Sequence, residues 1–418
     1  MSSPVRKITI QGMLLQFPFW FGCCTYFSFI VATLVDYGWG DGQAAGAITA
    51  MAVISMLIQP VYGYICDRFM SEKQLTVLLL MLAAVSFFGM PFSLGSGSRT
   101  LIWLNMTGIA VTAVQVGGLI DAWIVGLKQE HPSINYGIIR GTGSLSYALS
   151  AQLAGVITIT FGHDARLWLG AVSFVMAAVV AINFRAARVV RTEATVFKDE
   201  RRITDEKKGS HLRKKEKKSP GTLGGLEAVK RVFSSKQYNL LLAVSFFLLL
   251  GNFAMTTLLQ LVIPEMGGTA AQIGTAVAVM AGSEVPLMLL VAFILKKIGF
   301  QRLLLFCSLA YVIRMFVTAS ATTVDGLIYA QLFQGITYAI LLPLAINYLS
   351  QIIDESVRAT AVTIYTAVTV SLSAIMANLI TSSLLTGGIS AQSILPLFAL
   401  LTTCGLFLTL YGNVRKIW

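Results

Sequence analysis

Long apolar blocks recur along nearly the whole chain, each about twenty residues long and continuous. A helix of that length spans a hydrocarbon core of roughly 30 Å. The pattern is continuous and not alternating, which argues against an outer-membrane barrel. Only 12% of the 418 residues are charged, against roughly a quarter in a soluble domain. We therefore predict an all-α membrane protein. The expected spans are 12–35, 43–65, 75–94, 100–125, 138–161, 165–184, 238–262, 270–295, 301–321, 324–350, 358–385 and 391–413.

The blocks form two sets of six, separated by one long polar segment. This segment contains KDERRITDEKKGSHLRKKEKKSP, which has too few large apolar residues to fold alone. We predict an N-terminal bundle over 1–184, a mobile basic linker over 185–237 and a C-terminal bundle over 238–418. In this context the basic run is interpreted as a topology determinant and a contact for lipid headgroups, not as a nucleic-acid patch.

Lysine and arginine gather on one side of the predicted bilayer. That side carries both chain ends, the linker and the loops with Arg68, Lys128 and Arg358, whereas the other side has only Arg99 and Arg166. The asymmetry predicts that both termini are cytoplasmic in a multi-pass plasma-membrane protein. We expect a retained first span and no cleavable signal peptide. The cysteines have no metal-ligand spacing, so we expect packing roles and neither metal nor cofactor: Cys23, Cys24, Cys66, Cys307, Cys404.

The two halves repeat one another at corresponding turns. GYICDRFMSEKQLTVLLL follows the second span, and AFILKKIGFQRLLLFC follows the eighth. Paired six-span halves are an architecture of secondary transporters, which bind solute and ion near the midplane between the halves. Gly63-Tyr-Ile-Cys-Asp67-Arg68 resembles the loop motif G-x-x-x-D-R/K-x-G-R/K-R/K of the major facilitator superfamily, without its second glycine. We interpret Gly63, Asp67 and Arg68 as a conformational latch, with Asp67 near a helix N-terminus. The resemblance implies the major facilitator fold, with twelve helices in two pseudo-symmetric six-helix bundles.

Within that superfamily the chain most resembles the lactose permease branch of oligosaccharide:proton symporters. The segments that carry the resemblance are GLIDAWIVG, YGIIRGTGSLSYALSAQLAG, AGSEVPL and YVIRMF. By this resemblance Asp121 pairs with Arg140, Tyr147 stacks on a sugar, Glu284 binds sugar hydroxyls and Arg314 is the ninth-span arginine. The family's tenth span carries lysine, histidine and glutamate, whereas YAQLFQGITYAILLP here has no ionisable group except tyrosine.

Four ionisable residues lie inside predicted spans, two in each half: Asp121, Arg140, Glu284 and Arg314. Each costs about 2.5–3.5 kcal/mol on insertion scales, so such residues line cavities or pair with one another. A carboxylate in a low-dielectric cavity can be protonated near neutral pH. Glu284 is therefore our main candidate for proton coupling, with Arg314 and Asp121 as further members. The alternative is a glutamate that fixes helix packing, paired with Arg314.

The other candidates have a structural alternative too. Asp121 and Arg140 are expected to form a bidentate pair, which either binds solute or holds two helices together. Tyr147 follows Arg140 by two helical turns and either stacks on solute or packs. Asn252 and Gln334 are expected to hydrogen-bond solute hydroxyls. The alternative for each is a hydrogen bond between helices. Further uncharged candidates of this kind are Gln260, Gln331, Asn347 and Asn378, and Asp36 is expected as a solvated end charge.

The function that follows is secondary active transport by alternating access. We expect a monomer that moves a small polar solute of the sugar class together with protons, in contact with membrane lipids and without nucleic acid. No G-x-x-x-x-G-K-[ST] motif occurs, which argues against ATP-driven transport. The alternatives are proton-linked efflux of sugars or drugs, nucleoside uptake, and a membrane solute sensor. An intramembrane enzyme is disfavoured because the three histidines (His131, His163, His211) fall outside the predicted spans.

Overall fold

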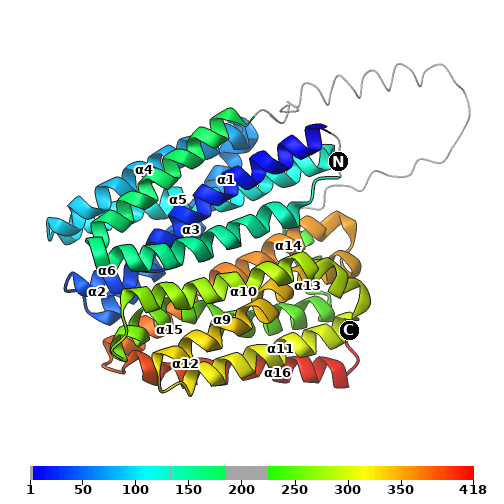
Figure 1. Ribbon diagram of the computed structural model, residues 1–418. Coiled ribbons are helices and arrows are strands. Elements are labelled where there is room, and N and C mark those ends of the chain that lie inside the picture. The colour runs from blue at the N-terminus through cyan, green and yellow to red at the C-terminus, as the bar shows by residue number, and fades with distance from the viewer. Residues whose placement is uncertain (1–2, 132, 185–224) are drawn as a thin grey trace, which may run out of the picture.

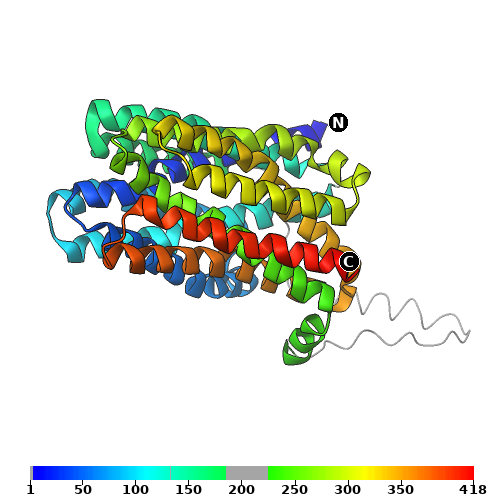
Figure 2. The same ribbon diagram turned by 90° about the horizontal axis from the view of Figure 1, so that it is seen from below.

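The computed structural model describes residues 3–131, 133–184 and 225–418, and the described chain is helical (Figure 1). Ten of its stretches are long and apolar enough to cross a membrane. The helices run side by side as one elongated bundle, and both chain ends lie at the same end of it (Figures 1 and 2). We call this the terminal end and the opposite one the far end.

The N half comprises the helices before residue 184. They are α1 Ser3–Phe27, α2 Ile30–Asp36, α3 Asp41–Arg68, α4 Glu72–Gly95, α5 Arg99–Glu130 and α6 Tyr136–Asn183.

The C half comprises the described elements from residue 225 onward. They are α8 Gly225–Phe233, α9 Lys236–Glu265, α10 Ala270–Lys297, α11 Phe300–Ala319, α12 Val324–Ala330, the 3₁₀ turn η1 Gln331–Phe333, α13 Gln334–Ile352, η2 Glu355–Val357, α14 Arg358–Thr366, the π-helical η3 Ala367–Leu372, α15 Ser373–Thr386 and α16 Ala391–Val414.

Helix α6 contains two of the expected spans in one continuous element. Its 48 residues would measure about 72 Å at 1.5 Å per residue, more than twice the thickness of a hydrocarbon core. Gly162 divides it, with φ 83° and ψ 178°. A positive φ of this kind suits glycine, which has no Cβ. The chain therefore turns back between the expected spans 138–161 and 165–184.

Two other spans are interrupted where the sequence predicts continuous helix. The first span is split between α1 and α2, and the tenth contains the 3₁₀ turn η1 between α12 and α13. In the first span, the Gln260 carboxamide of α9 takes the place of one backbone hydrogen bond. Its Nε2 donates to the Phe27 carbonyl at 3.0 Å, and Val31 N donates to its Oε1 at 2.8 Å. A side chain inserted into the backbone ladder is a known cause of a helix break.

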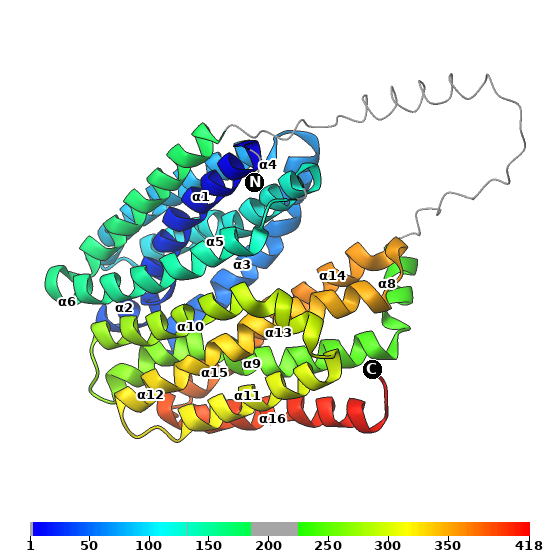
Figure 3. The ribbon, with the colours of Figure 1, turned by 45° about the vertical axis from the view of Figure 1, so that its right-hand side comes forward.

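The two halves meet closely at the far end and diverge toward the terminal end (Figure 3). Ser382 Oγ of α15 donates to the Gly42 carbonyl of α3 at 2.7 Å. A Cβ on Gly155 of α6 would lie 2.7 Å from the Ala270 carbonyl oxygen of α10, so glycine is required for this approach. The structure is therefore closed between the halves at the far end.

The surface of the bundle is apolar, as a lipid-facing surface must be. Leu104, Val172 and Phe407 are more than half exposed although each lies inside a long apolar helix. Buried aromatic and aliphatic side chains fill both halves, with Phe87 and Phe174 in edge contact in the N half at a ring separation of 4.6 Å. The all-α architecture predicted from the sequence, with apolar helices long enough to span a membrane, is confirmed.

Candidate functional site

Arg314 lies fully buried in α11 and is held by neutral side chains. Its Nη1 donates to Asn252 Oδ1 at 2.8 Å and to Gln334 Oε1, and its Nη2 donates to Gln331 Oε1 at 2.8 Å. Among the described residues, no carboxylate oxygen lies within 4.0 Å of this guanidinium. Three amide oxygens satisfy hydrogen bonds but carry no formal charge. The positive charge of Arg314 is therefore not neutralised by a direct ion pair.

The 3₁₀ turn η1 places two of these amides together. Side chains at positions i and i+3 eclipse one another in 3₁₀ geometry. Gln331 and Gln334 have this separation, and both accept hydrogen bonds from Arg314. The interruption of the tenth span thus aims two glutamines at one guanidinium, where a regular α-helix would set them at different angles.

Gln334 connects Arg314 to Glu284 of α10, and Glu284 in turn contacts the N half. The Gln334 Nε2 donates to Glu284 Oε1 at 3.0 Å, while the Oε1 of the same amide accepts from Arg314. Glu284 Oε2 accepts from Ser144 Oγ of α6 at 3.3 Å. The Glu284 side chain is buried, at 9% exposure. One carboxylate therefore joins the two halves, and the Gln334 amide is oriented by a cation on one side and a carboxylate on the other.

The approach of α13 to α10 depends on Gly335. Its backbone N donates to Ser283 Oγ at 3.0 Å. A Cβ at Gly335 would collide with the Ser283 carbonyl. A glycine is thus required next to Gln334 in sequence, so that this side chain reaches Glu284 on the neighbouring helix.

The charged residues of the N half belong to a second hydrogen-bonded group. Gln16 Nε2 of α1 donates to Asp121 Oδ1 of α5 at 3.0 Å, and Trp20 Nε1 donates to Gln16 Oε1 at 2.5 Å. The Arg140 guanidinium stacks over the Trp20 ring at 4.4 Å.

The expected bidentate pair between Asp121 and Arg140 is not formed. In the part of the chain that the structure describes, no nitrogen of Arg140 comes within 4.0 Å of an Asp121 oxygen. The reason is the first span: Gln16 occupies the carboxylate and Trp20 occupies the guanidinium.

Tyr147 lies on the same side of α6 as Arg140 and also contacts Trp20. The two rings meet edge to face with centroids 6.2 Å apart, and the Tyr147 hydroxyl is 2.9 Å from Ser28 Oγ. Asp121, Arg140 and Tyr147 are all half-buried. The three N-half candidates therefore retain some accessible surface, which the fully buried Arg314 lacks.

Both groups lie close to the junction of the halves. Ser144, which donates to Glu284, lies one helical turn after Arg140 on α6. Trp20 contacts Arg140 and donates to Gln16, which in turn bonds Asp121. The structure thus brings the four predicted ionisable residues into one region.

Several members of this region were missed by the reasoning from sequence. Ser144 carries no signal that separates it from a packing residue. Gln16 and Trp20 do carry one, since a polar amide and an indole stand four residues apart in an apolar span. A residue pair at i and i+4 shares one helix face, so this pair was detectable.

The predicted latch residues lie at the end of α3. Gly63 and Arg68 are in its last two turns, and Arg68 Nη1 donates to Tyr64 Oη at 3.3 Å. Asp67 occupies the C-terminal turn of α3, and the next helix, α4, begins at Glu72. The Asp67 side chain lies outside the described part of the structure, and the latch stays a prediction.

Comparison with known proteins places the chain in a family. The model of the MFS_1 like family matches residues 34–393. The chain is 27% identical over 330 residues to a maltose permease of Geobacillus stearothermophilus, covering 78% of this chain and 75% of the relative. It is 21% identical over 330 residues to the uncharacterized transporter YwbF of Bacillus subtilis (strain 168), covering 78% and 74%.

Solved structures give the same fold. A crystal structure of a variant of the nucleoside transporter NupG superposes with a TM-score of 0.74 at 15% identity, covering 97% of this chain and 99% of that one. A further NupG structure gives a TM-score of 0.70 at 13% identity, covering 98% and 99%. From the family match over most of its length, this chain is a member of the MFS_1 like family of major facilitator superfamily transporters, and it is not an enzyme.

Proposed function

We propose that this protein is a secondary transporter that moves a small polar solute of the sugar class together with protons, by alternating access. The observation that carries the proposal is Glu284, a buried carboxylate whose hydrogen bonds reach both halves. A group in that position changes its contacts when the halves separate. Its protonation state can therefore be linked to their movement.

The side chains grouped around Glu284 support a neutral hydroxylated solute. Half-buried Asp121 offers acceptor oxygens, Arg140 offers donors, and the Tyr147 and Trp20 rings offer flat apolar surfaces. Carboxylates, guanidinium groups and aromatic faces together suit the hydroxyls and the C–H faces of a sugar. The relative named maltose permease supports the same class, and the chain's resemblance to the lactose permease branch agrees.

Solute binding and proton binding would meet at Glu284. Solute hydroxyls that replace Ser144 on Oε2 would detach the N half from this carboxylate. Gln334 would hold Oε1 and transmit the Arg314 charge. The deprotonated form of Glu284 would then be favoured while Gln334 connects it to Arg314. The protonated form would be favoured once this connection to Arg314 is lost.

The same proposal includes the orientation in the membrane and the units that move. We place both termini and the linker over 185–237 in the cytoplasm, because lysine and arginine gather at the terminal end. The far end then faces outward, and the closed far end makes this structure inward-facing. The two bundles over 1–184 and 238–418 would act as the moving units of a monomer. Residues 185–224 lie outside the described residues.

Proteoliposomes containing the purified protein test the proposal. Maltose, other sugars and nucleosides are added to lightly buffered vesicles, and the internal pH is followed for wild type and Glu284→Gln. The expected result is a sugar-dependent proton flux that the variant loses while it retains sugar exchange. Glu227→Gln is the matched control, since Glu227 is exposed on α8.

Sugar movement without proton movement would refute the coupling. A flux with nucleosides alone would replace the sugar class, and efflux or sensing would appear as outward transport or as binding without exchange.

A further inference from the structure

The first span contacts Asp121 and Arg140 in a way that uses little of their hydrogen-bonding capacity. Gln16 donates one hydrogen bond to Asp121, at 3.0 Å from Nε2 to Oδ1. An ionised carboxylate can accept about four such bonds. Trp20 contacts Arg140 through its ring, whose centroid lies 4.4 Å from the guanidinium carbon. That contact depends on the positive charge and consumes no N–H donor.

Arg140 keeps its hydrogen-bond donors unused. Among the residues that the structure describes, none accepts a hydrogen bond from its N–H groups, and its side chain is half-buried. A bidentate pair with Asp121 would instead occupy both carboxylate oxygens and a matching pair of donors. Because the two groups are held apart, they offer donors and acceptors separately, and solute hydroxyls can use both kinds.

Trp20 also fixes which way the Gln16 amide faces. Gln16 is fully buried, and its Oε1 accepts from Trp20 Nε1 at 2.5 Å. The indole nitrogen is only a donor, so the amide oxygen must face it and the amide nitrogen must face Asp121. Trp20 therefore acts on Asp121 through Gln16, and it acts on Arg140 directly.

The packing of α1 against α6 leaves room for this indole. A Cβ at Gly143 of α6 would lie 2.5 Å from Trp20 Cδ1 and 3.1 Å from Arg140 Nη1, so glycine is required there. Ser146 and Ser150 of the same helix each donate to a backbone carbonyl of α1, at 2.5 and 2.7 Å. These two bonds lie one helical turn apart and fix the register of the helices. Trp20 is thus held over Arg140 by the packing of two helices.

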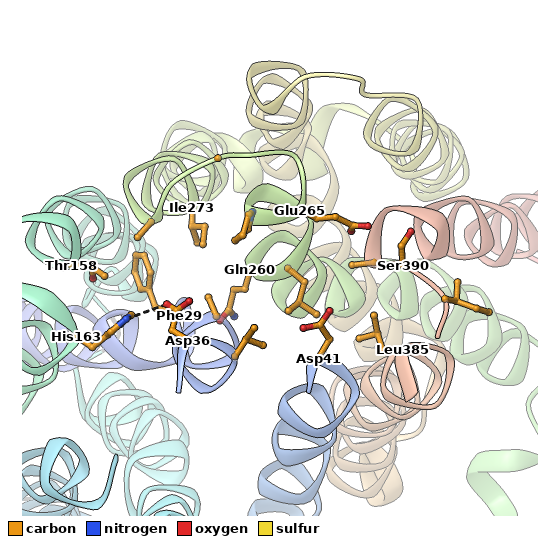
Figure 4. A pocket seen from close by; sticks show the side chains of 18 of the residues that line it. Phe29, Asp36, Asp41, Thr158, His163, Gln260, Glu265, Ile273, Leu385 and Ser390 are labelled. Atoms are coloured by element: carbon orange, nitrogen blue, oxygen red, sulfur yellow. Dashed lines mark ion pairs between the residues drawn. The ribbon is translucent and has the colours of Figure 1, made fainter. Parts of the chain in front are cut away.

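An unseparated pair at the far end provides a comparison. Asp36, at the end of α2, and His163 of α6 line a cavity of about 550 Å³ (Figure 4). The sequence predicts a solvated end charge for Asp36, but its Oδ2 lies 3.1 Å from His163 Nε2. Facing groups of α2 and α6 therefore pair where no side chain lies between them. The separation of Asp121 from Arg140 is a local effect of the residues around them.

We propose that Gln16 and Trp20 are positioning residues of the first span. They keep the Asp121 carboxylate and the Arg140 guanidinium from pairing, and so leave both groups available to the solute. Without this separation, the two opposite charges attract one another in a half-buried region of low dielectric constant and compete with the solute. The inference rests on the proposed function for its solute, and it adds a part in solute affinity for two residues of α1.

Thermal unfolding tests the separation without any solute. Asp121→Asn, Arg140→Gln and their combination are compared in three backgrounds: the wild type, Gln16→Leu and Trp20→Leu. The non-additive part of the shift in melting temperature measures the interaction between the two charged residues. We expect it to be at least about twice as large in the Gln16→Leu and Trp20→Leu backgrounds as in the wild type. Equal non-additivity in the wild type and in either folded variant would overturn the proposal.

Maltose exchange in proteoliposomes gives the readout that a packing role would not change. We expect Gln16→Leu to raise the half-saturating maltose concentration about tenfold, because the solute must now displace an ion pair. The maximal rate should change by less than about twofold. Gln115→Leu is the matched control, since Gln115 Nε2 of α5 donates to a backbone carbonyl of α3, that of Ser55, at 2.7 Å. Its half-saturating concentration should stay close to the wild-type value.

The two measurements separate this inference from the proposed function. Stronger pairing in Gln16→Leu with an unchanged half-saturating concentration would overturn the part in solute affinity. An equal rise in Gln115→Leu would overturn it too, because the loss of any bond between helices would then explain the effect. Wild-type protein that exchanges no maltose would refute the proposed function for this sugar. The unfolding comparison would still decide whether the first span holds the two charges apart.

Discussion

Arg314 shows most clearly how a single residue is accommodated in this protein. A fully buried guanidinium is held by three amide oxygens, and the carboxylate that balances it is one side chain further away. Breaking a direct buried ion pair leaves an isolated charge, which is strongly destabilising. An interposed amide keeps Glu284 and Arg314 apart, so the carboxylate can exchange partners while Arg314 stays hydrogen-bonded to Asn252 and Gln331.

Replacement of Gln334 by leucine tests this bridge. Gln334→Leu removes one acceptor from Arg314 and one donor from Glu284. Unsatisfied buried groups of this kind cost about 1–3 kcal/mol each, and more when charged. We expect the midpoint of thermal unfolding to fall by several degrees and sugar-driven proton flux to fall more than about tenfold. Gln351→Leu on the same helix is the control, because Gln351 is exposed. Wild-type transport and melting in Gln334→Leu would rule the bridge out.

The sequence predicts which residues gather at the centre, but not how they pair. A charge inside an apolar span is costly wherever the span packs, so Asp121, Arg140, Glu284 and Arg314 stand out without any structure. Their partners depend on side chains distant in the chain. Gln16 is 105 residues from Asp121, and Ser144 is 140 residues from Glu284. The expected Asp121–Arg140 pair was wrong for this reason.

At the scale of elements, the same limit explains the breaks in the helices. The turn at Gly162 lies in a short polar segment between apolar blocks, and the sequence therefore predicts two spans there. The break between α1 and α2 has no local proline or glycine to announce it. Its cause is Gln260, which is 229 residues from Val31. A break imposed from another helix cannot be read from the sequence around it.

The Gln260 bridge predicts a change of shape in the first span. When the halves separate at the far end, Gln260 must leave, and Val31 N can then pair with the Phe27 carbonyl as in a regular helix. The net loss is about one hydrogen bond, or about 1 kcal/mol. Gln260→Leu removes that cost, so we expect the far-end-open population to rise about fivefold. Distances between spin labels on Ser96→Cys and Ile389→Cys measure this population. Ser96 lies in the loop between α4 and α5, and Ile389 lies in the loop before α16.

A matched variant tests whether the effect is specific to the Gln260 bridge or follows from the loss of any hydrogen bond between the halves. Gln152 Oε1 of α6 accepts from Thr275 Oγ1 of α10 at 3.1 Å, also across the halves, but this amide bridges no backbone break. Gln152→Leu is expected to leave the distribution of distances close to that of the wild type. Equal distributions for Gln260→Leu and the wild type would show that the bridge does not hold the far end closed.

At the scale of the whole molecule, several close contacts between the halves lie at one end, beyond the central Ser144–Glu284 hydrogen bond. Ser382 with Gly42, Gly155 with Ala270, and Gln260 with the first span all lie at the far end. The ribbons diverge toward the terminal end (Figure 3). Contacts at a single end allow two rigid halves to rotate about a central region, which for this chain contains Glu284. Alternating access requires these far-end contacts to break in every cycle.

A reversible link across the far end tests that requirement. Gln152→Cys and Thr275→Cys are combined in a variant whose five natural cysteines are replaced by alanine, because their native side chains touch across α6 and α10. A short thiol-specific cross-linker then holds the far end closed, and mass spectrometry measures the linked fraction. We expect sugar uptake to fall in proportion to that fraction and to recover on reduction, since a locked far end admits no solute.

The same reagent on Asn347→Cys and Gln351→Cys, four residues apart on α13, should leave uptake unchanged because it links no moving parts. Uptake that persists in fully linked protein would mean that solute crosses without separation of the halves at α6 and α10, and the rocking of two rigid halves would then be the wrong description of this transporter.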